Sequence, residues 1–301
     1  MSKTFANLWK NRPYLLMALP AVLILFFFSY VPMAGVILAF KKYDYTLGMW
    51  NSPWVGLENF KFLISSKALF TNMLKNTLFY YVVFTVVGMV LSIALAIALD
   101  QLVFKRFSKS LQTIMIIPTF ISYAAVQFVV YAYLNSNNGM INEVFNLTTR
   151  WYMEPNAWPF ILTLVKIWNG VGYGSILYMS VLAGIDSSLY ESAEIDGANK
   201  WKQILHITLP SLVPMITIQL LLSVGGVMRS DTGLFYQVTR NSSMLYDTTQ
   251  VIDSYVLDSI FTSSNFGFTA ATTLFQSIVG MILILISNMI VRKLEPDNAL
   301  F

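Results

Sequence analysis

Residues 76–99 read NTLFYYVVFTVVGMVLSIALAIAL, a stretch without a single charged side chain that is bounded by Lys75 and Asp100. A helix needs about 20 predominantly apolar residues to cross the roughly 30 Å hydrocarbon core of a bilayer. A run of this length and apolarity predicts a membrane-spanning helix.

The same criterion, applied outward from this stretch, finds five further runs. One of them contains a charge, Lys166, and another begins close to Arg12. The latter lacks a small-residue cleavage site, so we expect it to remain as a helix, bent at Pro32, and not to be a cleaved signal peptide. We predict spans at about 13–40, 76–99, 110–134, 158–185, 210–228 and 270–291.

The composition of the whole chain supports a membrane protein. Of the 301 residues, 56% are hydrophobic and 11% are charged, against about 25% charged in soluble domains. Cysteine is absent, which excludes disulfides, thiolate metal sites and a cysteine nucleophile. We therefore predict an all-α polytopic membrane protein with six transmembrane helices in residues 13–291, flanked by short segments at 1–12 and 292–301, and with no role for nucleic acid.

The basic residues of the loops predict the orientation, because lysine and arginine accumulate on the cytoplasmic side of a membrane protein. The short loop Lys105–Lys109 and the pair Arg292–Lys293 lie directly beside spans. We therefore expect both termini and the loop between spans four and five to face the cytoplasm. The outer loop 41–75 carries apolar residues at near-helical spacing from Leu57 to Leu74, which favours an amphipathic helix over a docking surface for an external partner.

The loop 187–210 has strong local signals for structure. Ser188 and Glu191 fit a capping box, and Gly197 stands where a left-handed C-terminal cap is needed. A second short amphipathic helix should follow, and Pro210 suits the first turn of the fifth span because that turn needs no proline N–H. We predict a stiff helix–turn–helix at the cytoplasmic face.

This loop resembles the EAA loop of ABC importer permeases. The usual pattern is Glu-Ala-Ala, three residues, Gly, and a spacer that ends in Ile-x-Leu-Pro; here Ser192 replaces one alanine, a small-for-small change. Residues 53–60 and 76–77 resemble sugar-uptake permeases, and residues 167–174 and 250–256 resemble the branch that imports oligosaccharides and polysaccharide fragments. The resemblance covers nearly the whole chain.

The resemblance implies a type I importer transmembrane domain in a bacterial inner or plasma membrane, whose EAA loop forms a coupling helix against a cytoplasmic ATPase. It also implies a second permease subunit, two ATPase subunits that bind ATP and magnesium, and an external sugar-binding protein. This chain has no phosphate-binding loop, so we expect no ATPase activity and no cofactor or metal of its own. The coupling residues that the resemblance assigns are Glu191, Ser192, Ala193, Asp196, Gly197, Ala198, Leu209 and Pro210.

Polar and aromatic side chains recur on one face of several spans, a pattern typical of a pathway for a hydroxyl-rich solute or of a helix–helix seam. We favour a pathway for spans three and four and seams for spans five (Gln219, Ser223, Gly226) and six (Thr273, Gln276, Gly280). Lys166 has two interpretations, a side chain that reaches the outer headgroups or a group in a polar cavity. The candidate pathway residues are Tyr123, Gln127, Tyr131, Lys166, Asn169 and Tyr173.

Two other classes of protein compete with a permease subunit. A stand-alone secondary transporter or channel is disfavoured, because no aspartate or glutamate lies within a predicted span. A membrane-embedded enzyme would need clustered acids or histidines, and the single histidine, His206, is expected at the surface of the loop 187–210.

Overall fold

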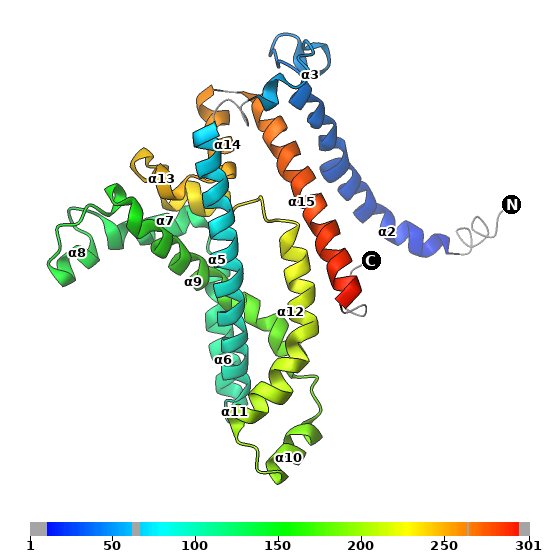
Figure 1. Cartoon of the computed structure of the whole chain (residues 1–301), viewed down its shortest axis with the longest axis vertical. Helices are drawn as coiled ribbons and strands as arrows, with labels where there is room; N and C mark the ends of the chain where they lie inside the picture. The colour runs from blue at the N-terminus through cyan, green and yellow to red at the C-terminus, as the bar shows by residue number, and fades with distance from the viewer. Residues whose placement is uncertain (1–10, 62–66, 264, 295–301) are drawn as a thin grey trace. The chain divides into compact units, whose positions relative to one another are not determined.

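The computed structural model describes residues 11–61, 67–263 and 265–294, and these are almost entirely helical (Figure 1). Five helices are long and apolar enough to cross a membrane, and a bent helix pair supplies a sixth span. The helical class and the span count predicted from the sequence are confirmed. The main helices are α2 (Arg12–Leu25), α5 (Lys67–Asp100), α6 (Lys105–Ile116), α7 (Tyr123–Leu134), α9 (Trp158–Leu182), α10 (Ser187–Ile195), α11 (Lys200–Gln203), α12 (Leu209–Val224), α14 (Ile252–Ser263) and α15 (Phe266–Leu294).

The third span, predicted at about 110–134, is broken into two helices in the structure. Helix α6 ends in a 3-10 turn, Ile117–Phe120, and α7 leaves that turn at 98°. Ile121 and Ser122 have extended backbones between the two helices. Pro118 lies at the start of the 3-10 turn and has no N–H for an α-helical hydrogen bond, which gives the break a local cause. The stripe of residues that begins at Tyr123 thus belongs to α7 alone.

Contacts divide the chain into two units, of which the smaller contains residues 1–65 and 259–275. Its first helix runs from α2 through a π-helical turn, Phe26–Tyr30, into 3-10 turns at Val31–Phe40, so the helix geometry changes around Pro32. The Asn59 amide donates to the carbonyls of Leu38, Ala39 and Lys41, which satisfies acceptors that the end of a helix leaves free.

The long amphipathic helix expected in the outer loop from Leu57 to Leu74 is not formed as one element. Gly48 and Gly56 adopt positive φ angles, and only the short helix α3 (Gly48–Asn51) and a 3-10 turn at Glu58–Phe60 follow Phe40 before residue 61. Residues 62–66 lie outside the described part of the chain, and from Lys67 onward the chain already belongs to α5.

The larger unit contains residues 66–258 and 276–301, and its core forms around α5 and α9. Helix α9 turns Trp158, Leu162 and Val165 inward at helical spacing. Glycine allows close approach where α9 meets α6, because a Cβ at Gly172 would overlap the carbonyl oxygen of Met115. Figure 1 shows α10 and α11 beyond one end of α5, whereas α13 (Tyr246–Thr249) lies beside its other half. This separates the loop 187–210 from the polar groups described below.

Candidate functional site

Helix α10 of the loop 187–210 begins one residue after Asp186, whose carboxylate caps it. Asp186 Oδ1 accepts from the backbone N–H of Ser188 at 3.0 Å, and this bond holds the pKa of the carboxyl below its usual value. The predicted capping box of Ser188 and Glu191 is wrong because aspartate already occupies the cap, two positions before Ser188. Glu191 is instead an exposed side chain of α10.

The turn at Gly197 matches its sequence prediction. Gly197 has a φ of +77°, its N–H donates to the Glu194 carbonyl at 3.0 Å, and the Ala198 N–H donates to the Ala193 carbonyl at 2.8 Å. This pair of bonds is a Schellman motif, which satisfies the last carbonyls of α10. A Cβ at Gly197 would meet no atom within 4 Å, so glycine is needed here for its backbone and not for space.

The second helix of the loop is continuous with the fifth span. Asn199 caps α11 by accepting from the Lys202 N–H at 2.9 Å, and a π-helical turn, Ile204–Thr208, joins α11 to α12. The helix thus runs from Lys200 to Val224, so the separate second helix expected from the sequence is wrong. Leu209 and Pro210 form the first turn of α12, as predicted for the proline. His206 is exposed on this loop, as expected, and its Nδ1 lies 3.0 Å from the Lys202 carbonyl oxygen.

Two polar contacts stiffen the loop, and apolar side chains remain exposed on it. Lys200 Nζ lies 2.8 Å from Glu194 Oε1, and this contact lowers the pKa of Glu194. The hydroxyl groups of Tyr190 and Thr208 form a hydrogen bond of 3.0 Å. The exposed large apolar residues are Leu189, Ile195 (87% exposed), Trp201 (74%) and Leu205. Large apolar side chains that are exposed together on one short loop are a reason to look for an interaction surface.

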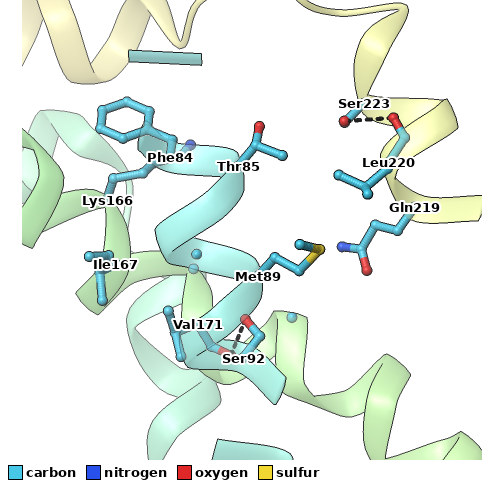
Figure 2. A pocket seen from close by; sticks show the side chains of 13 residues that line it. Phe84, Thr85, Met89, Ser92, Lys166, Ile167, Val171, Gln219, Leu220 and Ser223 are labelled. Carbon is cyan, nitrogen blue, oxygen red and sulfur yellow. Dashed lines mark hydrogen bonds between the residues drawn. The ribbon is translucent and has the colours of Figure 1, made fainter. Parts of the chain in front are cut away.

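A cavity of about 230 Å³ lies among α5, α9 and α12 in the larger unit (Figure 2), and its mixed lining includes the polar side chains of Thr85, Ser92, Lys166, Gln219 and Ser223. Figure 2 shows Gln219 and Ser223 on α12 facing Thr85 and Met89 of α5 across this cavity. The hydroxyl groups of Tyr81 and Ser223 form a hydrogen bond of 3.0 Å. By contrast, Gln219 Oε1 is buried and has no hydrogen-bond donor among the described residues. A buried acceptor without a donor is costly, so this cavity suits a ligand with hydroxyl donors.

Lys166 of α9 lines the same cavity and forms an ion pair. Its Nζ lies 2.9 Å from Asp231 Oδ2, and the side chains of the pair are 34% and 33% exposed. The ammonium also lies 5.8 Å from the centre of the Tyr123 ring. Sequence reasoning missed Asp231, because a single carboxylate in a polar loop carries no signal for its partner in α9.

Asn169, predicted for the pathway, is largely occupied by protein contacts. Its Nδ2 donates to the Pro118 carbonyl at 2.7 Å, its backbone carbonyl accepts from Thr119 Oγ1 at 2.5 Å, and its Oδ1 accepts from the Tyr123 hydroxyl at 3.3 Å. The buried Asn169 therefore satisfies the polar groups that the break of the third span exposes.

The other predicted pathway residues fall in different places. Gln127 and Tyr131 of α7 line a hollow of about 260 Å³ together with Phe128 and Arg240. The Arg240 guanidinium lies 4.2 Å from the centre of the Tyr131 ring. Tyr173 is 56% exposed and lines neither this hollow nor the cavity beside Lys166. The structure thus brings Tyr123, Lys166 and Asn169 together, places Gln127 and Tyr131 beside Arg240, and leaves Tyr173 apart.

Residues 88–298 match the family model described as the binding-protein-dependent transport system inner membrane component. The chain belongs to this family of transport permeases. It is 30% identical to the polygalacturonan/rhamnogalacturonan transport system permease YteP of Bacillus subtilis, over 94% of this chain and 88% of that protein. It is also 30% identical to LplB of the same organism, over 97% of this chain and 92% of that protein.

Solved structures support the same family. The permease superposes with a TM-score of 0.87 on a chain of a bacterial ABC transporter that imports the acidic polysaccharide alginate, at 26% identity and over 98% of this chain and 100% of that one. A second structure of that kind of transporter, in complex with an alginate pentasaccharide-bound periplasmic protein, matches with a TM-score of 0.85, at 26% identity, over 97% and 98% of the two chains. The resemblance to ABC importer permeases and the type I importer fold inferred from the sequence are confirmed.

The fifth and sixth spans of the permease carry the polar residues that we expected to form helix–helix seams. Gln219 and Ser223 of the fifth span line the cavity beside Lys166. Ser223 also forms a hydrogen bond with Tyr81 of α5, as expected for a helix–helix seam. The sixth span does form a seam, because a Cβ at Gly280 would lie 2.5 Å from the Gly225 carbonyl oxygen. Gln276 Nε2 donates to the Met228 carbonyl at 2.6 Å in the same seam.

Proposed function

We propose that this permease is a translocation subunit of an ATP-driven importer that takes up acidic oligosaccharides delivered by an external binding protein. The observation that carries the proposal is the likeness to the alginate importer over 98% of this chain. A relative that matches over 94% of this chain is a permease for polygalacturonan and rhamnogalacturonan, polysaccharides that also contain uronic acids. A second permease subunit and two ATPase subunits, which bind the ATP and magnesium, would complete the transporter.

The loop 187–210 is proposed as the coupling element that docks on the ATPase. Its Schellman turn and capped helices make it stiff, and its apolar side chains and Glu191 are exposed for a partner. A stiff element can transmit movement to the membrane because α11 continues directly into α12. Ser192, Ala193, Asp196, Gly197 and Ala198 shape α10 and its turn, whereas Leu209 and Pro210 begin α12.

The cavity among α5, α9 and α12 is proposed as part of the route for the saccharide. It offers the Gln219 acceptor and the Ser223 hydroxyl, and Lys166 lies at its wall. Saccharides present hydroxyl donors, hydroxyl acceptors and apolar C–H faces, which suit amides, hydroxyls and tyrosine rings. Tyr123 supplies such a ring beside Lys166.

Reconstitution in proteoliposomes tests the proposal, with the partner permease, the ATPases and the binding protein present. We expect ATP-dependent accumulation of labelled acidic oligosaccharides and none when the ATPases are omitted. Accumulation driven by a proton or sodium gradient without the ATPases would instead support the alternative of a secondary transporter or channel.

The orientation proposed for the chain places both termini and the loop 187–210 in the cytoplasm, in a bacterial inner or plasma membrane. The chain has no cysteine, so single cysteines can report the side of the membrane. Asn199→Cys should resist an impermeant reagent added outside intact cells, while Asn51→Cys, exposed in the outer loop, should react. Labelling of Asn199→Cys from outside would overturn this orientation.

A further inference from the structure

Arg240 has a backbone conformation that an arginine seldom adopts. It follows the π-helical turn η8 (Gly233–Val238), and its φ of +56° and the φ of +48° at Asn241 both lie in the left-handed region. Non-glycine residues in this region carry a cost, and asparagine tolerates it better than arginine. A left-handed arginine persists where surrounding contacts hold it, and such strain is a reason to look for function.

The contacts around Arg240 hold both the turn and the side chain. The Asn241 side chain donates to Asp258 Oδ1 at 2.9 Å and accepts from the Tyr246 hydroxyl at 3.0 Å. The Arg240 guanidinium lies on the face of Tyr131 at 4.2 Å, which favours a cation electrostatically. Stacking on a ring leaves the N–H groups at the edge of the guanidinium plane free to donate.

Within the described part of the chain, no carboxylate forms an ion pair with Arg240. Among the residues that the structure describes, the ion pairs are those of Lys105, Lys166 and Lys200, and none includes Arg240. The exposed Arg240 and the half-buried Gln127 line one hollow of about 260 Å³ with Tyr131. A fixed guanidinium, an amide and an aromatic face in one hollow are the groups that recognise a carboxylate carried on a sugar ring.

Helix α7 connects this hollow to Lys166, because it carries the tyrosine that each cation contacts. Tyr123 and Tyr131 lie eight residues apart on α7, which is roughly 12 Å along a helix axis. Lys166 lies over Tyr123 at one end of this stripe and Arg240 over Tyr131 at the other, with Gln127 between. One sugar ring is shorter than this separation, so the arrangement suits an oligomer.

We infer that the hollow of Arg240, Tyr131 and Gln127 binds the carboxylate of a uronic acid unit in the oligosaccharide that passes through the importer proposed above. Arg240 is the group that distinguishes acidic from neutral saccharides. Its guanidinium donates two parallel N–H bonds to the carboxylate, while the ring of Tyr131 orients the guanidinium. Lys166 does not serve this purpose at rest, because Asp231 already neutralises it.

The test compares an acidic oligosaccharide with the same oligosaccharide after reduction of its carboxyl groups to alcohols, in the reconstituted importer with loaded binding protein in excess. The variant Arg240→Asn removes the charge with a residue that keeps the left-handed turn. We expect the initial rate of ATP-driven uptake to fall about 10-fold or more for the acidic substrate, as for loss of a charged hydrogen bond. Uptake of the reduced substrate should remain unchanged.

Two further variants sharpen the comparison. Arg240→Lys keeps the charge but not the planar pair of donors, so it should show a smaller selective loss. Arg150→Asn removes an exposed arginine from the loop before α9 and should leave both substrates unaffected. If Arg240→Asn fails to assemble with its partners, the selective loss in Arg240→Lys decides the question.

Equal loss of both substrates in the Arg240 variants would overturn the site, and would indicate a role in the turn or at a lipid headgroup. Unchanged uptake of both substrates would overturn it as well. A wild-type importer that takes up only the reduced oligosaccharide would refute both the acidic substrate class and this site, while leaving the importer itself intact. If no saccharide is accumulated in the presence of ATP, the importer function itself fails.

Discussion

Lys166 Nζ lies 2.9 Å from Asp231 Oδ2, although 65 residues separate the two in the chain. About a third of each side chain is exposed, and such partly exposed pairs contribute about 0–1 kcal/mol to stability. The pair is therefore weak enough for a passing ligand to separate. Of the two interpretations of Lys166 made from the sequence, this arrangement fits the one that places it in a cavity, because Lys166 lines the cavity among α5, α9 and α12. The pairing of its ammonium with Asp231 was part of neither interpretation.

Replacing either member of this pair should change uptake without preventing assembly. Lys166→Met should lower the uptake of acidic oligosaccharides, whereas Asp231→Asn should raise their apparent affinity by up to about fivefold because a competing carboxylate is lost. Uptake assays in proteoliposomes measure both effects. The exchanged pair Lys166→Asp with Asp231→Lys restores the ion pair; full recovery of acidic uptake in it would show that the pair acts only in structure.

Gly197→Val should reduce both transport and the ATP hydrolysis that the binding protein stimulates. Valine disfavours the φ of +77°, at a cost of roughly 1–2 kcal/mol, although its side chain would meet no neighbour within 4 Å at Cβ. Gly197→Asn is the matched control, since asparagine adopts this conformation more readily. Uptake and ATPase activity stimulated by the binding protein should be reduced in the valine variant and nearly normal in the asparagine variant. Equal behaviour of the two variants would contradict a backbone requirement.

Helix α10 should fray when the pH falls below the usual aspartate range. The pKa of Asp186 is lowered because its carboxylate accepts from the Ser188 backbone N–H, and the pKa of Glu194 is lowered mainly by Lys200. A depressed native pKa means that this stabilisation is present above the unfolded-state pKa, near 4, and is lost as the pH falls through the lower native value. Hydrogen exchange of the α10 amides at pH 3–6 measures it, and Asp186→Asn should weaken the dependence. Protection that is independent of pH in the wild type would contradict the cap.

Gly172→Ala should destabilise the packing of α6 on α9. Its methyl group would overlap the Met115 carbonyl oxygen, a backbone atom that can move only with its helix, and overpacking of this kind costs about 1–3 kcal/mol. Gly170→Ala, two residues away in the same helix, would meet no atom within 4 Å and serves as the control. Thermal unfolding of the purified complex in detergent should show a lower midpoint for Gly172→Ala alone. A normal midpoint in that variant would show that α6 can shift without cost.

The part of the fold that depends on local sequence was predictable. A run such as 76–99 spans a membrane because its own apolar side chains favour hydrocarbon, whatever their neighbours. The turn at Gly197 was also readable, because the left-handed conformation and the Schellman bonds involve only residues within the loop. The cap was misread because two local candidates, Asp186 and Ser188, compete for the same amide donors, and geometry decides between them.

The polar sites depended on tertiary structure. The chain by itself determined which helices are apolar enough to cross the membrane and where the loop 187–210 turns, since hydrophobicity and backbone preference act over a few neighbouring residues. Only the folded chain decided that Asp231 neutralises Lys166, that Asn169 satisfies the carbonyl of Pro118, and that Arg240 lies on the ring of Tyr131. Those contacts join segments that are distant in sequence. The local sequence around a charged residue does not indicate which distant residue the fold will place beside it.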